Sequence, residues 1–458
     1  MPACAQHLFH EGTRHLGAGD YSQAEQCFRA AIDEQPGMAE AHANLAWLLA
    51  ETGDSVQADV SYGRALDLAP GNEQIRLNHG AFLAELKRFP EAQGAYAMAL
   101  QRNGSSAKVW SNLGALYAQM NRFADAKACC RKSISLDPAY AKAHTNLSYL
   151  LLREGRFEEG LKHYEFRPWQ TYLSAPVDGL RWSGEALEGR SILVAHEAGY
   201  GDMIQFCRYA ALLRERGAAR ISMTCPPALM SLFGSLHGVD ELLPSDQPLP
   251  RSDFDFWVSM MSLPFHCGTR FESVPGGGAY LSADPVAAAH WASRLPTGAP
   301  LVGLVWKGNP LFENDADRSL PSLDELASLG EVDAVRFVSL QKGPGEDEAL
   351  RHTSSSLRIL PFGHELADFA DTAALIANLD LVITVDTAVA HLAAAIGKPC
   401  WIMLPDHMTD WRWLAGREDS PWYPGTVRLF RQAQRGDWSG VAAEVKKSLE
   451  AFVAERFD

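Results

Sequence analysis

The sequence predicts an all-helical repeat array followed by an α/β region of two doubly wound lobes. Three observations support this prediction. Asparagine recurs every 34 residues, at Asn44, Asn78, Asn112 and Asn146. After the last of them, short apolar runs that are typical of buried parallel strands alternate with helical patterns. This alternation occurs in two series on either side of a Pro-rich linker near residues 296–300, and each series predicts a parallel sheet with helices on both faces.

Other positions of the repeat keep the same step. Alanines followed by Gly160 recur in one column, large aromatic residues in a second, and prolines end three of the units. A 34-residue unit with small residues at the helix crossings and a terminal proline resembles the tetratricopeptide repeat, in which two helices must stack on their neighbours to bury an apolar face. Five units can be recognised, and they begin near Ala5, Ala39, Glu73, Ala107 and Ala141.

The recurring asparagines fall on the first helix of each unit, where asparagine has no propensity advantage. A carboxamide can bond both the N–H and the C=O of a peptide without reading any side chain. First helices line the concave face in the resembled repeat family, and this file of asparagines resembles the ladder of the protein O-linked N-acetylglucosamine transferases. We therefore predict that Asn44, Asn78, Asn112 and Asn146 bind an acceptor peptide. Recent duplication, or asparagine bonds between neighbouring repeats, are the alternatives.

The bulk composition restricts the function. The chain has 458 residues, of which 47% are hydrophobic and 21% charged, and its net charge of −15 argues against nucleic acid or an anionic membrane as the main target. Eight cysteines without C-x-x-C spacing predict neither a zinc site nor a disulfide framework. The N-terminus has no basic and apolar leader, and no later apolar stretch is free of charges, so we expect a cytoplasmic protein without membrane insertion.

Three domains are predicted. Residues 1–168 form the repeat superhelix, residues 169–298 the first lobe, and residues 299–458 the second lobe with a C-terminal helix. The fifth repeat lacks its terminal proline and runs into the segment from Tyr164 to Trp169, which we interpret as the join to the first lobe.

In the first lobe, residues 191–195 form a short apolar run, followed by a glycine loop and a helical pattern over 204–214. Further strands are predicted at 219–224 and 255–259. In the second lobe the predicted strands cover 301–305, 336–340, 357–360, 381–385 and 400–404. The helices between them are predicted near 323–329, 346–351, 372–378 and 388–396.

Asp386 and Thr387 are predicted to lie at the end of a strand and the start of a helix. Unpaired N–H groups and the helix dipole favour an anion such as a diphosphate at such a position. His391 follows Thr387 by four residues, so both should lie on the same helix face. A capped helix with a buried histidine is the structural alternative.

The segment from Asp386 through Thr387 and His391 to Gly397 and Pro399 resembles bacterial heptosyltransferases and their relatives of the two-lobed GT-B class. This resemblance implies that the segment holds a nucleotide-sugar donor in the second lobe. The first-lobe loop Gly199-Tyr-Gly-Asp202 resembles the G-x-G-D loop of the same family, whose aspartate is the proposed general base. Arg318 replaces a lysine of the family, and Ala388 replaces a glycine, so the donor stays open.

The strand and loop from Val302 to Pro310, with Asn314 and Arg318, resemble the donor-phosphate loop of the family, and Lys342 is a further candidate cation that a solvated turn would also explain. The predicted donor-binding residues are Trp306, Lys307, Asn309, Arg318, Gln341, Lys342, Asp386, Thr387 and His391.

Glycosyl transfer needs a base for the acceptor hydroxyl and stabilisation of the departing diphosphate. Asp202 is the predicted base, with a helix cap before Met203 as the structural alternative; Glu197 and His196 are the other candidates. A helix terminus and cations would neutralise the diphosphate, so no metal is expected. Asp315-Ala-Asp317 has metal-site spacing but adjoins Arg318, which favours an ion-paired loop. Four aromatic residues could stack on the base or sugar, or pack between the lobes: Trp411, Trp413, Trp422 and Tyr423.

These residues together predict a metal-independent, inverting glycosyltransferase that moves a sugar from a nucleotide-activated donor to a Ser/Thr of a protein, such as flagellin or an adhesin, recruited by the repeats. Two alternatives are an enzyme that acts on a lipopolysaccharide or other glycan, and a non-catalytic binding protein. The expected partners are a nucleotide sugar and a protein acceptor, and not nucleic acid.

Overall fold

The structure is a computed structural model that describes residues 2–168, 179–249, 254–312, 314–351, 357 and 359–457. The chain divides into two compact units, Met1–Leu147 and Ser148–Asp458. The predicted join at Trp169 lies outside the described residues, and the three predicted domain boundaries stay predictions. No described helix contains an 18-residue stretch that is apolar enough to cross a bilayer.

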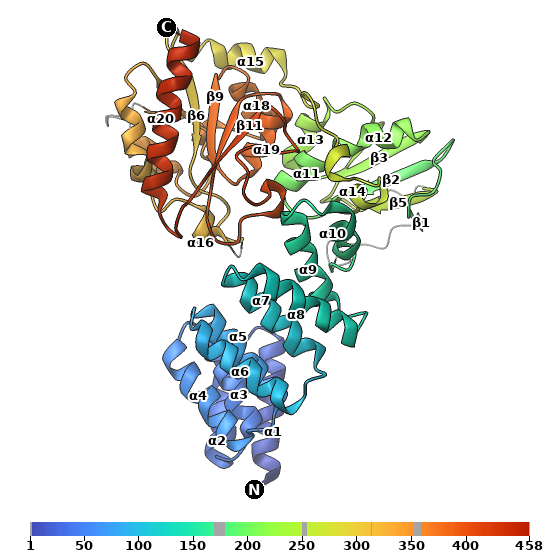
Figure 1. Cartoon of the computed structure of the whole chain (residues 1–458), viewed down its shortest axis with the longest axis vertical. Coiled ribbons are helices and arrows are strands. Elements are labelled where there is room, and N and C mark those ends of the chain that lie inside the picture. Colours follow the sequence, from blue (N-terminus) through green and yellow to red (C-terminus); the bar gives the residue numbers. More distant parts are fainter. Residues whose placement is uncertain are drawn as a thin grey trace. The chain divides into compact units, whose positions relative to one another are not determined.

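The first unit is a stack of antiparallel helix pairs (Figure 1). The first helices of four units begin at Ala39, Glu73, Ala107 and Ala141, where the 34-residue period predicts them. The helices are α1 Pro2–Gly17, α2 Tyr21–Glu34, α3 Ala39–Glu51, α4 Ser55–Leu68, α5 Glu73–Glu85, α6 Phe89–Arg102, α7 Ala107–Gln119, α8 Phe123–Leu136 and α9 Ala141–Arg153, which continues into the second unit.

Glycines explain how closely the two helices of a pair approach each other. A Cβ added at Gly80 on α5 would lie 2.5 Å from the ring of Tyr96 on α6. One added at Gly12 on α1 would lie 2.7 Å from the ring of Phe28 on α2. The aromatic column of the repeat therefore packs directly on backbone, and any larger side chain at these glycines would separate the helices.

The first sheet of the second unit is parallel and has the strand order β1-β5-β2-β3-β4. Its strands are β1 Leu180–Arg181, β2 Ser191–Ala195, β3 Arg220–Cys225, β4 Glu241–Pro244 and β5 Phe256–Ser259. Because β3 lies on one side of β2 and β5 on the other, the order of the strands reverses at β2. The sequence predicts β2, β3 and β5 but not β1 and β4, which are short edge strands.

The second sheet is also parallel, with the order β11-β10-β9-β6-β7-β8, and its order reverses between β6 and β9. The strands are β6 Leu301–Val305, β7 Arg336–Ser339, β8 Ile359–Leu360, β9 Leu381–Val385, β10 Cys400–Leu404 and β11 Val427–Arg431. The predicted strands are confirmed within two residues, and Arg358 lies outside the described residues. The edge strand β11, with Arg428 and Arg431 in its five residues, is the strand that the sequence did not predict.

Helices cover both faces of the sheets (Figure 1). In the second lobe, side chains of α20 pack into one core cluster with those of β6 and β9, and side chains of α18 and α19 pack into another. The remaining helices are α10 Phe157–Tyr164, α11 Tyr200–Phe206, α12 Tyr209–Glu215, α13 Pro227–Phe233, α14 Leu263–His266, α15 Pro285–Ala292, α16 Asp315–Arg318, α17 Glu346–Arg351, α18 Phe369–Ile376, α19 Ala388–Ala395 and α20 Trp438–Phe457.

Two helix predictions need correction. The predicted helix over 204–214 is two helices, α11 and α12, with a turn at Cys207 and Arg208. The Nε of Arg208 donates to the carbonyl of Gln205 at 2.7 Å. This carbonyl would accept from a backbone N–H if the helix continued, and here it accepts from a side chain instead. The segment predicted as a helix near 323–329 is a 3₁₀ helix, Leu323–Glu331.

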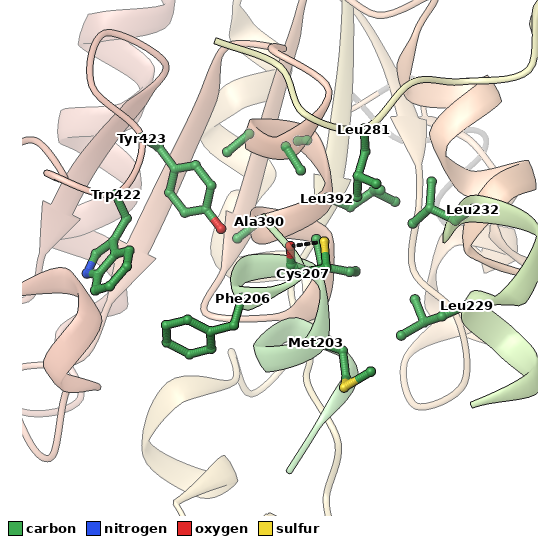
Figure 2. Packing of buried hydrophobic residues seen from close by; sticks show 14 of the residues in the cluster. Met203, Phe206, Cys207, Leu229, Leu232, Leu281, Ala390, Leu392, Trp422 and Tyr423 are labelled. Carbon is green, nitrogen blue, oxygen red and sulfur yellow. Dashed lines mark hydrogen bonds between the residues drawn. The ribbon is translucent and has the colours of Figure 1, made fainter. Parts of the chain in front are cut away.

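The core of the second unit includes the last helix of the repeats. Phe157 and Tyr164 of α10 are buried, and both rings contact the ring of Trp411. Figure 2 shows how α11 contributes to the same cluster, with Phe206 directed toward Trp422 and Met203 toward the leucines of α13. The apolar face of α10 is therefore buried against the α/β lobes.

Candidate functional site

The loops that follow two inner strands, one from each sheet, form the candidate site. The loop after β2 runs from His196 to Gly199 and leads into the first turn of α11, which holds Asp202, and the loop after β9 contains Asp386 and Thr387. Both strands border the position at which their sheet reverses its strand order, and ligands of doubly wound proteins bind beyond the carboxyl ends of the strands at such positions.

The two loops lie against each other because α11 packs on α19. A Cβ added at Gly201 would lie 2.9 Å from Cδ2 of His391 and 3.4 Å from Cα of Ala388. Gly201 therefore permits the close approach of the first lobe to the start of α19. The preceding Ala198 has a φ of +67°, a left-handed conformation that is uncommon for alanine.

Asp202 lies in the first turn of α11. Asp202 does cap a helix, as its structural alternative predicts, but it does so as the third residue of α11, which starts at Tyr200 after the N-cap residue Gly199 and not at Met203. The N–H of Gly199 donates to Oδ2 of Asp202 at 2.9 Å, and Oδ1 forms an ion pair with Arg412. Burial raises the pKa of Asp202 above its ordinary value, while the charge of Arg412 opposes this rise.

Arg412 is the site residue that the sequence analysis missed. It lies in a 3₁₀ turn, Trp411–Trp413, that follows β10, and only 7% of its side chain is exposed. Its Nη1 donates to both carboxylate oxygens of Asp410 at 2.9 Å, and its Nη2 donates to Asp202. An arginine flanked by two tryptophans is the sequence signal that could have indicated a buried guanidinium.

Asp386 and Thr387 lie where the sequence predicts them. Thr387 is the N-cap residue of α19, and its hydroxyl lies 3.0 Å from that of Thr384 without capping the helix. Burial, reinforced by the charge of Asp410 and opposed by that of Arg318, raises the pKa of Asp386 to about 6. The role of both residues in donor binding stays a prediction.

His391 is buried beneath this loop. Its Nδ1 lies 2.8 Å from the hydroxyl of Tyr423, and its ring stacks on that of Trp413 at 5.1 Å between centroids. Burial, together with the charges of Arg412 and Arg208, holds the pKa of His391 well below its ordinary value, so the imidazole is neutral. His391 therefore packs under the loop that holds Asp386 and Thr387, as a buried, neutral side chain.

The predicted aromatic residues are packing residues. Trp411, Trp413, Trp422 and Tyr423 are at most 4% exposed and belong to the core cluster that joins the two lobes. Of the two roles considered for them, packing between the lobes agrees with this burial.

Arg318 lies near Asp386, since its charge lowers the pKa of that carboxyl. Its Nε donates to Asp315 at 3.1 Å, and its guanidinium lies 4.4 Å from the centroid of the Phe312 ring. A Cβ added at Gly308 would lie 2.7 Å from Nη2 of Arg318, so the glycine of the Lys-Gly-Asn segment makes room for this arginine.

The two other candidate bases are engaged elsewhere. Both carboxylate oxygens of Glu197 accept bonds from Arg167 at 2.7 Å, and the side chains of both residues are at most 6% exposed. The imidazole of His196 has Nδ1 3.3 Å from the hydroxyl of Thr224, and burial lowers its pKa. Asp202 is paired as well, with Gly199 and Arg412, so the choice of the base among the three residues stays a prediction.

Several predicted donor residues brace the loops after β6 and β7. The carboxamide of Gln341 accepts from the N–H groups of Trp306 and Lys307 and donates to the carbonyl of Lys307, each at 3.0 Å. Trp306 is fully buried, and its indole N–H and the amine of Lys307 both donate to Glu348.

Two further predicted donor residues lie nearer the surface. Lys342 is exposed and donates to the carbonyl of His364 at 3.1 Å, and its role stays a prediction. Asn309 is exposed and accepts from the N–H of Leu311.

The repeat asparagines are half-buried and bond within the first unit. Asn78 accepts from Gln74 at 2.8 Å on its own helix, and Asn146 donates to Ser111 of the preceding repeat at 3.5 Å. The contact of Asn146 agrees with the alternative that the asparagines bridge neighbouring repeats, whereas that of Asn78 stays within one helix, and peptide binding stays a prediction.

Comparison with known proteins supports the two-part organisation. Residues 9–73 and 107–140 match models of the tetratricopeptide repeat, and residues 345–402 match the model of glycosyltransferase family 9 (heptosyltransferase). The glycosyltransferase match contains Asp386, Thr387 and His391. The chain therefore carries tetratricopeptide repeats and a glycosyltransferase family 9 domain.

Among curated proteins, the chain is similar to Protein FlbA of Caulobacter vibrioides, with 30% identity over 319 residues that cover 65% of this chain and 53% of FlbA. The chain thus spans about half the length of this relative.

Among solved structures, it is similar to PilF of Pseudomonas aeruginosa (28% identity, TM-score 0.33, 36% of this chain and 75% of that one). It is also similar to MamA of Desulfovibrio magneticus (19%, TM-score 0.32, 37% of this chain and 97% of that one).

Proposed function

We propose that this protein is a nucleotide-sugar-dependent glycosyltransferase that modifies a protein recruited by its repeats. The observation that carries the proposal is the approach of α11 to α19 at Gly201, which places Asp202 of one lobe beside the helix start at Asp386 and Thr387 of the other. The match to glycosyltransferase family 9 supports the reaction class.

In the proposed reaction, an acceptor hydroxyl attacks the anomeric carbon of the donor while the bond from that carbon to the diphosphate breaks. Asp202 accepts the hydroxyl proton, and its raised pKa brings it closer to the strength of a useful base near neutral pH. Attack from the side opposite the leaving group inverts the configuration. The nucleoside diphosphate leaves with the bonding electron pair.

The first turn of α19 and Arg318 are proposed to stabilise the leaving diphosphate. The helix start supplies N–H groups and the positive end of the dipole, and a guanidinium fits two phosphate oxygens. These groups supply the positive charge that a divalent cation would otherwise bring, so the proposal includes no metal.

The acceptor is proposed to be a polypeptide with a Ser or Thr hydroxyl. Tetratricopeptide repeats support protein binding, and the asparagines on the first helices supply carboxamides for a peptide backbone. A lipopolysaccharide or other glycan acceptor is the second candidate, because the matched family is described as heptosyltransferase.

Calorimetric titration with UDP, GDP, ADP and CMP tests the donor assignment. We expect one of them to bind with a Kd below millimolar, and its sugar conjugate to be hydrolysed slowly in the absence of acceptor. If none binds at millimolar concentration, the transferase assignment is wrong. Incubation of the identified donor with candidate proteins and with glycan acceptors then separates the two acceptor classes by mass spectrometry.

A further inference from the structure

Arg412 holds the proposed base in an ion pair that spans the two lobes. Asp202 lies on α11 of the first lobe, and Arg412 lies on the turn after β10 of the second. Asp202 accepts at both oxygens, from Gly199 at one and from Arg412 at the other. A carboxylate that is paired with a guanidinium is a weaker base than an unpaired one, because the positive charge favours its ionised form.

The bonds of Arg412 are distributed unevenly. Nη1 bonds both oxygens of Asp410, Nη2 bonds Asp202, and Nε is buried without a hydrogen-bond partner among the described residues. Through Nε and Nη2 together, an arginine side chain can form two parallel hydrogen bonds to a carboxylate or a phosphate group. In Arg412, Asp202 accepts only from Nη2 of this pair.

Two aromatic rings lie close to the guanidinium of Arg412. Its centre lies 4.7 Å from the centroid of the Trp411 ring and 5.3 Å from that of the Phe206 ring. It bonds Asp202, and Gly201, the residue before Asp202, approaches Ala388 at the start of α19, so Arg412 lies near both the proposed base and this helix start. A diphosphate at that helix start would therefore come close to Arg412.

Charge around the helix start favours such an exchange of partners. Three carboxylates, Asp202, Asp386 and Asp410, surround this position, and Arg318 and Arg412 are the cations that act on Asp386. The carboxylates repel an incoming diphosphate, and bonds from Nε and Nη2 of Arg412 to the phosphate oxygens would offset this repulsion.

Resting on the proposed function, we propose that Arg412 binds the diphosphate of the nucleotide sugar and, by leaving Asp202, releases the base. The donor must then bind before Asp202 can accept the proton of the acceptor hydroxyl. As the bond from the anomeric carbon to the diphosphate breaks, the departing oxygen takes the electron pair and Arg412 stabilises its charge. Arg412 acts as a catalytic residue at the leaving group. Before the donor binds, its ion pair with Asp202 lowers the basicity of that carboxylate.

The test measures the Kd of the full chain for the nucleoside diphosphate identified above and for the matching uncharged nucleoside. Arg412→Gln should weaken diphosphate binding about 10- to 100-fold, the usual effect of one lost charged hydrogen-bonding group, and leave nucleoside binding unchanged. Arg417→Gln is the matched control, because Arg417 forms an exposed ion pair with Asp419 nearby in sequence.

A second variant keeps Arg412 and removes the carboxylate of Asp202, which competes with the diphosphate for this arginine. Asp202→Asn should strengthen diphosphate binding several-fold, because Arg412 no longer has to leave a carboxylate. In the Arg412→Gln background the same change should have no effect on the Kd, whereas a general loss of negative charge would strengthen binding in both backgrounds. If Arg412→Gln does not fold, as shown by the lack of a cooperative thermal transition, Asp202→Asn in the otherwise unchanged chain still tests the exchange, because a Kd that does not fall in that variant overturns it.

The outcomes separate the two proposals. If the unchanged chain binds no nucleoside diphosphate, the proposed function is wrong, and the proposed role of Arg412 is wrong as well. If the unchanged chain binds one, but Arg412→Gln binds it equally well or Asp202→Asn does not strengthen binding, the function stands and the exchange of partners by Arg412 is wrong.

Discussion

Asp202 illustrates what a residue gains from its surroundings. A glycine loop supplies the N–H that orients one carboxylate oxygen, and an arginine 210 positions away in the sequence binds the other. The loop itself was visible in the sequence. The arginine was not, because a contact over such a separation leaves no local pattern, and the same holds for Asp410, which binds that arginine.

Replacement of Asp202 by Asn should reduce turnover roughly 100-fold or more, which is the usual contribution of a positioned base. The amide keeps the shape of the carboxylate and loses its basicity. Steady-state rates with donor and acceptor, together with the thermal transition of the variant, measure the effect. An active variant would assign the proton to another group or would show that the reaction needs no protein base.

Asp386 should make the stability of the protein depend on pH. Its pKa in the folded protein, about 6, exceeds the ordinary value of 3.8, so between these values the folded state binds more protons than the unfolded state. The contribution of this carboxyl to stability therefore decreases as the pH rises through this window. Asp386→Asn removes the cost of the buried charge.

We expect the melting temperature of Asp386→Asn to exceed that of the unchanged protein by a few degrees at pH 7.5, and the difference to shrink toward pH 5. Calorimetric scans of both proteins across this range measure it. A difference that is constant with pH would show that Asp386 has an ordinary pKa.

Secondary-structure elements were predictable where their pattern was long or fully apolar. The 34-residue period predicted the starts of α3, α5, α7 and α9, and the inner strands were readable as continuous apolar runs. Short elements were not predictable. The two-residue β1 is too short for any periodicity, and the turn between α11 and α12 depends on a side chain that bonds a carbonyl.

The first helices of the repeats carry the prediction about the acceptor. Replacement of Asn78, Asn112 and Asn146 together by Ala should raise the KM for a protein acceptor roughly tenfold to a thousandfold, if each lost bond costs about 0.5–1.5 kcal/mol. Hydrolysis of the donor should be unaffected. As the control, exposed glutamines of the second helices are replaced by Ala: Gln26, Gln57 and Gln101.

Thermal unfolding distinguishes the two roles of these asparagines. The contact of Asn146 with Ser111 predicts some loss of stability in the triple variant. An early transition with an unchanged KM would mean that the asparagines only bridge repeats. A variant that folds and modifies protein normally would favour a small or glycan acceptor.

At the scale of the whole molecule, the burial of α10 leads to a prediction about where the transferase begins. Phe157, Leu161 and Tyr164 of α10 lie in the core of the second unit, and Arg167 forms the buried ion pair with Glu197. A chain that begins at Ala141 should therefore unfold cooperatively. A chain that begins at Trp169 should not, since Glu197 would lose its partner, a loss that typically costs about 3–5 kcal/mol.

Circular dichroism during heating measures both shortened chains against the full chain. A cooperative transition in the chain from Trp169 would place the domain boundary after residue 168, where the sequence predicts it. The sequence could not reveal the burial of α10, because the helix keeps the repeat pattern at Gly160 and Tyr164 while it packs against a different domain.

The burial of α10 also constrains how such a chain can change through evolution. Repeat arrays grow and shrink by gain and loss of whole units, because each unit contacts only its neighbours. Here the fifth unit is tied to Trp411 and Trp422 and cannot be exchanged without remodelling the transferase core. Duplication or deletion is therefore confined to the units before α9, so the length of the array, and with it the set of proteins that we propose it recruits, can diversify while the catalytic part stays constant.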